Sequence, residues 1–379
     1  MGDINQINDV ASANINQVND VAKANINEVN DQGVAASGAT IWVGIQDDRR
    51  ISTVSNSDLL AGNSWATYDS FSGGQSPHPG SNNDYIHVAY GKDGSGNAYW
   101  VASPQTDGCE LAHHDDPTAA PWTGVNTDSD GNNISGRAFA IQWGNDVWIA
   151  VGGMNSKDIR RSTNGSTWDT IDLSSVSGIT TTGIYALAQN GAGTWWFAQE
   201  NKIWQSTQDG ASGSWSLIHT LLNSSNADPG NIRALHFTNN TLVAGVDTND
   251  AFVFAAAVSD LTDWSNETTL TSGGNAFDTQ TQSAAYQGRV VCVGSNKKWT
   301  FDVDGKSITM DENNVQVAPD STSHGNFKGI STDGSTWVAV CSSGDVFTST
   351  NGGDSWTASH TNIGSKDFCD IAPDVYLPL

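Results

Sequence analysis

The chain has 379 residues, of which 16 are basic and 41 are acidic, so its formal net charge at pH 7 is −25. This charge excludes the basic surface that a nucleic-acid-binding protein needs to meet phosphates, and it disfavours adsorption to an anionic membrane. No apolar run approaches the roughly 18 residues of a membrane helix, so membrane insertion is not expected.

The N-terminal residues carry no targeting pattern. MGDINQINDV lacks the basic region and the apolar region of a secretory signal, so we expect synthesis in a cytosol. The four cysteines, Cys109, Cys292, Cys341 and Cys369, lie far apart with no CxxC pair. Neither a zinc site nor a disulfide framework is therefore expected from the cysteines.

An 11-residue repeat occupies the N-terminal segment: INQINDVASAN, INQVNDVAKAN and INEVND begin at Ile4, Ile15 and Ile26. Apolar residues recur at spacings typical of helices that wind into a right-handed supercoil. Asn is a weak helix former, and eight of the first 30 residues are Asn, so such a helix needs partners along its apolar stripe. The stripe consists of Ile4, Ile7, Ala11, Ile15, Val18, Ala22, Ile26 and Val29.

This pattern predicts that residues 1–32 form a hendecad helix that associates with copies of itself, as a trimer or another homo-oligomer, or docks on a larger assembly. The alternatives are a helix folded back on its own domain or a stack of short turns. The Gly- and Ala-containing residues 33–39 are then a flexible linker.

A second repeat begins at residue 40 and has a period of about 47 residues, which is typical of β-propeller blades. The second strand of a unit carries an aromatic residue, and a further Trp closes the unit. The first set is Trp42, Trp100, Trp148, Trp196 and Trp337; the second is Trp65, Trp122, Trp168, Trp215, Trp264 and Trp356, with one Trp missing near Met310. Seven units fit, so the prediction for residues 40–379 is an all-β, seven-bladed propeller.

The two ends of this region predict how the ring closes. The first unit, which begins with TIWVGIQ, has no leading strand, whereas residues 366–372 resemble the leading strands of other units, such as residues 327–330. We therefore expect the C-terminal strand to complete the first blade. Closure of this kind removes open strand edges, which otherwise promote aggregation.

Several turns of the repeat resemble the Asp-box, also known as the bacterial neuraminidase repeat. Residues 349–356 (STNGGDSW) match it with Asn351 in the Asp place, residues 162–168 and 331–337 are shorter versions, and residues 206–215 are a looser one. Physically these are hairpin turns, in which hydroxyl and Asx side chains hold the turn and Gly takes a positive φ. The motif specifies structure and is nearly silent on chemistry.

Together, the INxVNxVAxA-type repeats and the Asp-box propeller resemble virion structural proteins of tailed phages from marine and cyanobacterial hosts. The resemblance implies a non-enzymatic fibre, appendage or decoration subunit on the virion surface, assembled in the host cytoplasm. The partners that it implies are other virion proteins, further copies of the chain and host cell-surface glycans. A stand-alone lectin-like propeller is the alternative.

Asp-box propellers also include sialidases, so a glycosidase is the third hypothesis. The resemblance would imply three arginines around a substrate carboxylate, a Tyr-Glu nucleophile pair and a further acid. This chain has only seven Arg, lacks a Phe-Arg-Ile-Pro segment in its first blade, and shows no central acid pair. Catalysis is therefore not expected, since a shared fold does not establish function.

Two segments could hold a metal ion. Residues 126–132 (NTDSDGN) resemble the start of a calcium loop through Asn126, Asp128, Asp130 and Asn132, although Arg137 stands where a bidentate acid belongs. A plain polar turn is the alternative, and no other cofactor is expected. Residues 113–116 (HHDD) are dense in ligand atoms, but neighbours on a strand point to opposite faces, which favours a solvated loop.

Most Trp at blade spacing should pack in the core. Trp143, Trp204 and Trp299 are out of register with the repeat and are the predicted surface residues for stacking on a sugar ring. Cys292 and Cys341 lie in apolar strands and are expected to be buried.

Overall fold

The structure is a computed structural model, and the residues it describes are 17–18, 21–22, 40–46, 50–69, 85–104, 111–119, 122–125, 127–134, 138–152, 157–247, 252–264, 266–269, 282–294, 297–304, 307–310, 326–363, 367–375 and 377. The chain divides into two compact units, Met1–Val34 and Ala35–Leu379. Among the described residues, no helix is both long and apolar enough to cross a membrane.

The described part of the first unit is a two-stranded antiparallel sheet. Strand β1 (Gln17–Val18) pairs with β2 (Val21–Ala22), with Val18 opposite Val21. The predicted helix is therefore not seen at these four residues, whose backbone is extended. The residues between the strands are Asn and Asp, which favour turns and weaken helices. Ile4, Ile7, Ala11, Ile15, Ile26 and Val29 lie outside the described residues, as do the side chains of Val18 and Ala22.

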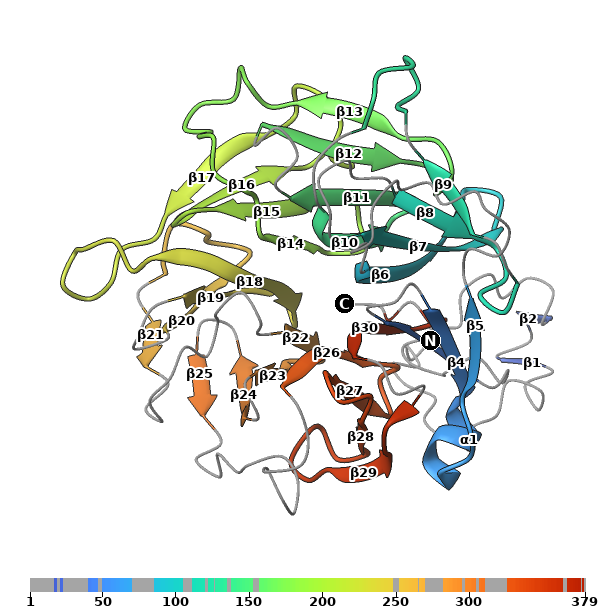
Figure 1. Cartoon of the computed structure of the whole chain (residues 1–379). Coiled ribbons are helices and arrows are strands. Elements are labelled where there is room, and N and C mark those ends of the chain that lie inside the picture. The colour runs from blue at the N-terminus through green and yellow to red at the C-terminus, as the bar shows by residue number, and fades with distance from the viewer. Residues whose placement is uncertain are drawn as a thin grey trace. The chain divides into compact units, whose positions relative to one another are not determined.

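The second unit contains seven four-stranded antiparallel sheets arranged as the blades of a propeller around a common centre (Figure 1). This confirms the predicted all-β, seven-bladed fold. From the innermost strand outward, the first blade consists of β30 (Phe368–Pro373), β3 (Ile41–Gln46), β4 (Arg50–Ser55) and β5 (Ala66–Asp69). The second blade consists of β6 (Tyr85–Lys92), β7 (Ala98–Pro104), β8 (Leu111–His114) and β9 (Thr123–Val125). The third blade consists of β10 (Ala138–Gly144), β11 (Val147–Gly152), β12 (Asp158–Ser162) and β13 (Asp169–Asp172).

The fourth blade consists of β14 (Ala186–Gln189), β15 (Trp195–Gln199), β16 (Lys202–Ser206) and β17 (Ser216–Thr220). The fifth blade consists of β18 (Asn231–Thr238), β19 (Thr241–Asp247), β20 (Phe252–Ala257) and β21 (Asn266–Thr269). The sixth blade consists of β22 (Gln282–Tyr286), β23 (Arg289–Gly294), β24 (Lys297–Asp304) and β25 (Ser307–Met310). The seventh blade consists of β26 (Phe327–Thr332), β27 (Trp337–Cys341), β28 (Val346–Ser349) and β29 (Thr357–His360). One short helix, α1 (Asn56–Ala61), lies between β4 and β5 in the described chain.

The core lies between blades rather than inside them. Each blade presents both of its faces to neighbours, so the second strands are continuous apolar runs, and all six residues of β11 are buried. One apolar cluster joins Val101 of the second blade to Trp148 of the third, and another joins Trp196 of the fourth to Leu242 of the fifth. Burial of these faces against each other is the main stabilising contribution to the ring.

The Asp-box turns join third strands to fourth strands. In the third blade, the Asn164 side chain accepts hydrogen bonds from the backbone N–H groups of Ser166 and Thr167, and the Trp168 indole N–H donates to the Gly165 carbonyl at 3.1 Å. The seventh blade repeats this bond between Trp356 and Gly353 at 2.9 Å. Residues 331–337, however, form the turn between the first and second strands of the seventh blade.

The first blade combines strands from distant parts of the sequence. Strand β30 pairs antiparallel with β3, with Gly44 opposite Ile371. Its neighbours on either side are the innermost strands of the second and seventh blades, β6 and β26.

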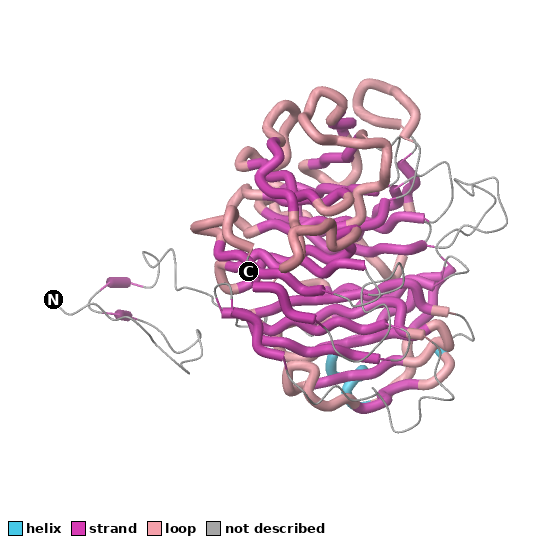
Figure 2. The backbone as a smooth tube through the Cα atoms, turned by 90° about the vertical axis from the view of Figure 1, so that its left-hand side faces the viewer, coloured by secondary structure: helices cyan, strands magenta, loops and turns pink. Residues whose placement is uncertain are grey.

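The blades meander regularly, so their connections alternate between two faces of the propeller (Figure 2). One face carries the turns between first and second strands and the Asp-box turns; we call it the turn face. The other carries the loops between second and third strands and the crossovers between blades; we call it the crossover face. The innermost strands begin at the crossover face.

Candidate functional site

A β-bulge recurs near the start of the innermost strands. The pairing register shifts around Ile86 in β6, Phe139 in β10, Arg233 in β18, Lys328 in β26, and Cys369 in β30. Tyr185 takes the equivalent place directly before β14, where its N–H donates to the Ala198 carbonyl. Because a bulge re-aims a side chain and is common at barrel rims and active sites, these residues mark the centre of the crossover face.

Three of these residues touch each other across consecutive blades. The Phe139 and Tyr185 rings stack with centroids 4.8 Å apart and an interplanar angle of 19°. The Arg233 guanidinium lies 3.8 Å from the centroid of the Tyr185 ring, and its Nε donates to Asp247 Oδ2 at 3.2 Å. We call Phe139, Tyr185, Arg233 and Asp247 the rim cluster, which spans the third, fourth and fifth blades.

The Arg233 guanidinium is fixed but incompletely used. Its Nε pairs with Asp247 and its face covers an aromatic ring, and the whole side chain is only 13% exposed. In the described part of the chain Nη1 is buried without a hydrogen-bond partner. A buried donor that lacks an acceptor costs about 1–3 kcal/mol, so the contacts with Asp247 and Tyr185 must offset this cost.

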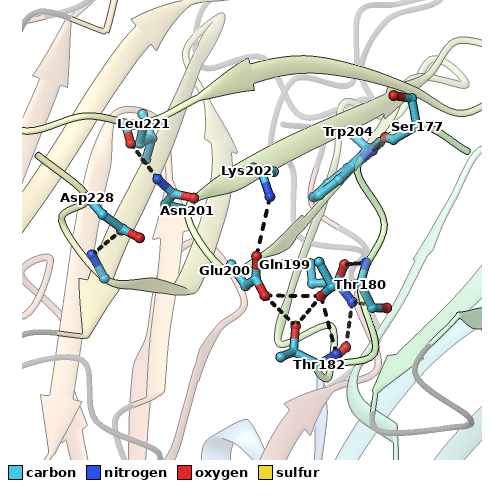
Figure 3. Close-up of polar contacts among 11 residues, drawn as sticks. Ser177, Thr180, Thr182, Gln199, Glu200, Asn201, Lys202, Trp204, Leu221 and Asp228 are labelled. Carbon is cyan, nitrogen blue, oxygen red and sulfur yellow. Dashed lines mark hydrogen bonds and ion pairs between the residues drawn. The ribbon is translucent and has the colours of Figure 1, made fainter.

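The crossover from β13 to β14, which leads to Tyr185, is fixed by hydrogen bonds (Figure 3). The Gln199 side chain accepts from the Thr180 N–H at 2.9 Å and donates to the Thr180 and Thr182 carbonyls. The Glu200 carboxylate accepts from the Thr180 and Thr182 hydroxyls at 3.1 and 3.3 Å, and from the Lys202 ammonium at 3.3 Å. The polar residues next to the rim cluster are therefore ordered by hydrogen bonds.

The turn between β15 and β16 also connects the fourth blade to the fifth. Glu200 has a φ of 55°, which is uncommon for a residue other than Gly. In this conformation its carbonyl accepts a hydrogen bond from the Ile232 N–H at 2.8 Å, directly before Arg233. The strained turn thus sets the position of Arg233 relative to Tyr185.

Space at the rim cluster is tight on one side. Gly183 lies against both rings, and a Cβ at this position would approach the Phe139 and Tyr185 rings within 3.1 Å. A side chain at residue 183 would therefore force the aromatic pair to move.

The prediction that Trp204 is a surface residue is wrong. Its side chain is completely buried between the third and fourth blades, where it stacks on Phe197 with centroids 5.2 Å apart. Its indole N–H donates to the Ser177 carbonyl at 3.1 Å (Figure 3). In β16 both Ile203 and Trp204 are buried, because the two faces of the strand pack against different neighbouring blades.

Trp143 and Trp299 are not part of the rim cluster. Trp143 is half-buried at the end of β10, on the turn face, and its indole N–H donates to the Lys92 carbonyl of the second blade at 2.6 Å. It also covers Gly91, where a Cβ would approach the Trp143 ring within 2.2 Å. Trp143 therefore joins two blades. Trp299 lies on β24, where its backbone is opposite Cys292 of β23, and its side chain lies outside the described residues.

The predicted calcium loop forms a tight turn around one carboxylate. Asp128 accepts hydrogen bonds from the Asp130 N–H, the Asn132 N–H and the Asn132 amide. The Thr170 hydroxyl donates to it at 2.7 Å, which is the main reason why the pKa of Asp128 lies below its ordinary value. Both of its carboxylate oxygens are thus engaged by donors of the turn and of β13. Asn126 lies outside the described residues.

This turn protects the outer edge of the third blade. The Ser129 N–H donates to the Trp168 carbonyl at 2.8 Å, and the Ser129 hydroxyl donates to Asp169 at 2.5 Å. Both acceptors belong to or adjoin β13, whose outer edge faces no further strand. Covering an edge strand in this way prevents unwanted pairing.

The HHDD segment is split between a strand and a turn. His113 and His114 lie on β8, and Asp115 and Asp116 follow in the connection to β9. Burial lowers the pKa of His113, while His114 Nδ1 lies 3.0 Å from Asp115. In the described residues no group of three or more His, Cys, Asp or Glu side chains is placed to hold a metal ion.

The rim cluster is not among the residues predicted from the sequence. A signal was present, because several leading strands share a pattern of an apolar residue, a variable residue, a small residue and another apolar residue. Residues 184–187 (IYAL), 232–235 (IRAL) and 327–330 (FKGI) show it, and the variable position is the one that the bulge re-aims.

Comparison with known proteins gives a fold. No family model and no curated protein sequence matches the chain. The structure described as YCF48 bound to D1 peptide matches with a TM-score of 0.51 at 13% identity, over 79% of this chain and 88% of that chain. Apo AztD from Citrobacter koseri matches with a TM-score of 0.48 at 10% identity, over 88% and 98%. The WD40 β-propeller domain of Doa1 matches with a TM-score of 0.48 at 10% identity, over 83% and 87%. The first likeness shows the propeller fold and nothing about the ligand.

Proposed function

We propose that this chain is a structural subunit of a phage particle, a fibre, appendage or decoration protein, that displays its propeller for recognition of a host-surface glycan. The rim cluster is the observation that carries the recognition role. It joins stacked aromatic rings, a fixed guanidinium and a carboxylate on the crossover face. Apolar walls with a few placed polar groups are what a small-ligand site requires.

The rim cluster suits a sugar because it offers both aromatic carbon and hydrogen-bonding groups. Aromatic rings give contact area at little conformational cost, and Tyr adds a hydroxyl at its edge. The Thr180 and Thr182 hydroxyls and the Glu200 carboxylate lie on the neighbouring crossover and turn (Figure 3). Phe139 and Arg233 already cover the two faces of the Tyr185 ring, so a ring-shaped polyol would contact the edge of the aromatic pair and hydrogen-bond to these polar side chains.

The particle role is supported by the N-terminal repeats of the INxVNxVAxA type, which resemble those of phage virion proteins. In this proposal, residues 1–32 associate with copies of the chain or with other virion proteins, residues 33–39 link them to the propeller, and the propeller performs no catalysis. A stand-alone lectin would use the same rim cluster without a particle.

Glycan binding can be tested with the full chain on an array of bacterial surface oligosaccharides. We expect the chain to bind a subset of glycans and Tyr185→Ala to bind them at least tenfold more weakly, a change of about 1.4 kcal/mol. Tyr286→Ala is the matched control, because Tyr286 is also half-buried but ends β22 on the turn face. Absence of glycan binding by the wild-type chain, or equal loss in both variants, would contradict the assignment.

The particle role needs a separate experiment. Mass spectrometry of purified phage particles should detect the chain at a fixed ratio to the major capsid protein, and antibodies against the propeller should label intact particles. A chain that is absent from particles but binds glycans would be the stand-alone lectin.

A further inference from the structure

Three Asn-Gly pairs occur in the sequence, at Asn164, Asn190 and Asn351. Asparagine is a thermolabile residue. When Gly follows it, the peptide nitrogen of Gly can attack the side-chain carbonyl carbon of Asn, because no Cβ on the Gly hinders the approach and its backbone is permissive. Whether a pair reacts in a folded protein then depends on how that nitrogen is hydrogen-bonded.

The side-chain carbonyl of Asn is polarised at all three pairs. Asn190 Oδ1, in the turn between β14 and β15, accepts from two backbone N–H groups of its turn at 2.9 and 3.0 Å. Asn351 Oδ1, in the Asp-box turn of the seventh blade, accepts from the Ser355 N–H at 3.0 Å. Asn164 has the corresponding bonds in the third blade. Donors in this place stabilise the negative charge that the oxygen takes on during attack, so the carbonyl does not distinguish the pairs.

The peptide nitrogen of the following Gly does distinguish them. The Gly165 N–H donates to the Ser162 hydroxyl at 2.8 Å, and the Gly191 N–H donates to the Gln189 side chain. Among the residues that the structure describes, the Gly352 N–H donates to no acceptor. A nitrogen whose proton is held by an acceptor must first release that bond, so Gly352 carries the free nucleophile of the three pairs.

The free N–H results from the length of the Asp-box turn. In the third blade the turn has the sequence STNGSTW, and the Ser162 hydroxyl accepts from Gly165, three residues later. In the seventh blade the turn is STNGGDSW, which is one residue longer. The Ser349 hydroxyl there accepts from the N–H of Gly353 at 2.9 Å, and Gly352 is passed over.

We propose that Asn351 is a site of spontaneous deamidation in the folded protein. The Gly352 nitrogen forms a bond to Asn351 Cγ and gives up its proton, and the side-chain nitrogen leaves as ammonia, so that a succinimide ring joins the two residues. Water then opens either carbonyl of the ring and leaves aspartate or isoaspartate. Asn351 is exposed, whereas Asn164 and Asn190 are half-buried, so water also has the best access at Asn351.

The two products have different effects on the turn. Aspartate at residue 351 is what the Asp-box motif has in this place, and its carboxylate still accepts from the Ser355 N–H and the Ser349 hydroxyl. Isoaspartate adds one carbon to the backbone of the turn. It displaces the Gly352 carbonyl, which accepts from Arg289 Nε of the sixth blade at 3.0 Å. The isoaspartate product therefore loosens a contact between the sixth and seventh blades.

The site is tested by incubating the full chain at neutral pH and mapping its peptides by mass spectrometry, with aspartate and isoaspartate separated by chromatography. We expect the folded chain to deamidate at Asn351 about tenfold faster than at Asn164 or Asn190, which are controls in the same molecule. In denaturant the three rates should become similar, because Gly follows Asn in all three pairs. Equal rates in the folded chain, or a difference that persists in denaturant, would overturn the proposal.

The effect on the blade contact is measured on the aged chain by urea unfolding. Its midpoint should fall below that of Asn351→Asp, which has the aspartate product alone and should unfold like the fresh wild type. An aged chain that is rich in isoaspartate and yet unfolds with Asn351→Asp would overturn the loosening of the contact and leave the deamidation site standing. The rates in the wild-type chain do not depend on whether this variant folds.

Discussion

At the scale of single residues, the Asp-box turns show how one hydrogen-bonding pattern serves two environments. Trp168 and Trp356 both donate an indole N–H to a Gly carbonyl three residues earlier in the chain. Trp168 is completely buried between the second and third blades, whereas Trp356 is only half-buried. The motif fixes the conformation of the turn, and the extent to which each Trp is buried against the neighbouring blade decides how much it stabilises the fold.

The difference gives a prediction for stability. Trp168→Ala removes a fully buried ring and leaves a cavity, so we expect a loss of about 3–5 kcal/mol in the free energy of unfolding. Trp356→Ala removes the same hydrogen bond but less buried area and should cost about 1 kcal/mol. Urea unfolding followed by tryptophan fluorescence measures both. Equal losses would mean that the turn, rather than burial, carries the energy.

A second residue-scale prediction concerns acid stability. His236 on β18 forms a 2.7 Å hydrogen bond with the Ser283 hydroxyl on β22, across the interface between the fifth and sixth blades. Burial lowers the pKa of His236 to about 4, from 6.5. The unfolded chain therefore takes up this proton more readily than the folded chain. Stability is complete above about pH 6.5 and falls as the pH drops towards 4, by on the order of 3 kcal/mol.

The measurement is the free energy of unfolding between pH 4 and 7 for the wild type and for His236→Gln. The variant keeps a polar group beside Ser283 but cannot take up the proton, so its stability should fall less steeply over this range. A variant that follows the wild-type curve would show that other groups cause the acid sensitivity.

Residue-level prediction from the sequence succeeded for packing and failed for the site. Trp42, Trp148, Trp168 and Trp337 are buried as expected, because a periodic Trp meets an equivalent neighbour in each blade, whereas Trp356 was expected in the core and is only half-buried. Trp204 was misassigned because both faces of β16 meet a neighbouring blade, so a Trp that is out of register with the repeat is buried as well. The rim cluster depends on bulges and on contacts between strands far apart in sequence, which hydrophobic periodicity does not encode.

At the scale of elements, the accuracy with which a strand or helix could be predicted depends on how regular its sequence repeat is. The blade strands were predictable because apolar runs and turn residues agree with each other. The N-terminal segment was less predictable, since its apolar spacing favours a helix while its Asn content opposes one. The described strands β1 and β2 show extended backbone within this segment. The Trp that the repeat lacks near Met310 is also absent from the structure of the sixth blade, where β25 has the sequence SITM.

Strand β30 gives an element-scale prediction. It is the innermost strand of the first blade and carries the buried residues Phe368 and Ile371. A chain without residues 367–379 would expose the inner edge of β3 and the apolar residues that β30 covers, so we expect it to aggregate or to lose its cooperative unfolding transition. Removal of residues 378–379 alone is the control. A soluble and cooperatively folding truncated chain would show that β30 does not close the ring.

At the scale of the whole molecule, the association state is the property that the proposed function requires. We expect the full chain to be a trimer or another homo-oligomer and a chain beginning at Ala39 to be a monomer, because the apolar stripe of residues 4–29 needs partners. Light scattering gives the solution mass of both. Monomers in both cases would rule out self-association and favour docking on another virion protein.

The pairing of β30 with β3 has a consequence for biosynthesis. About 320 residues separate the end of β3 from the start of β30. At the usual pace of translation the ribosome needs roughly 15 to 60 s to make them. During that time the nascent first blade has only three strands and an unpaired inner edge. Neighbouring nascent chains on one messenger RNA could pair through this edge, so slow codons late in the message would raise the yield of misassembled protein, and a chaperone that shields strand edges would lower it.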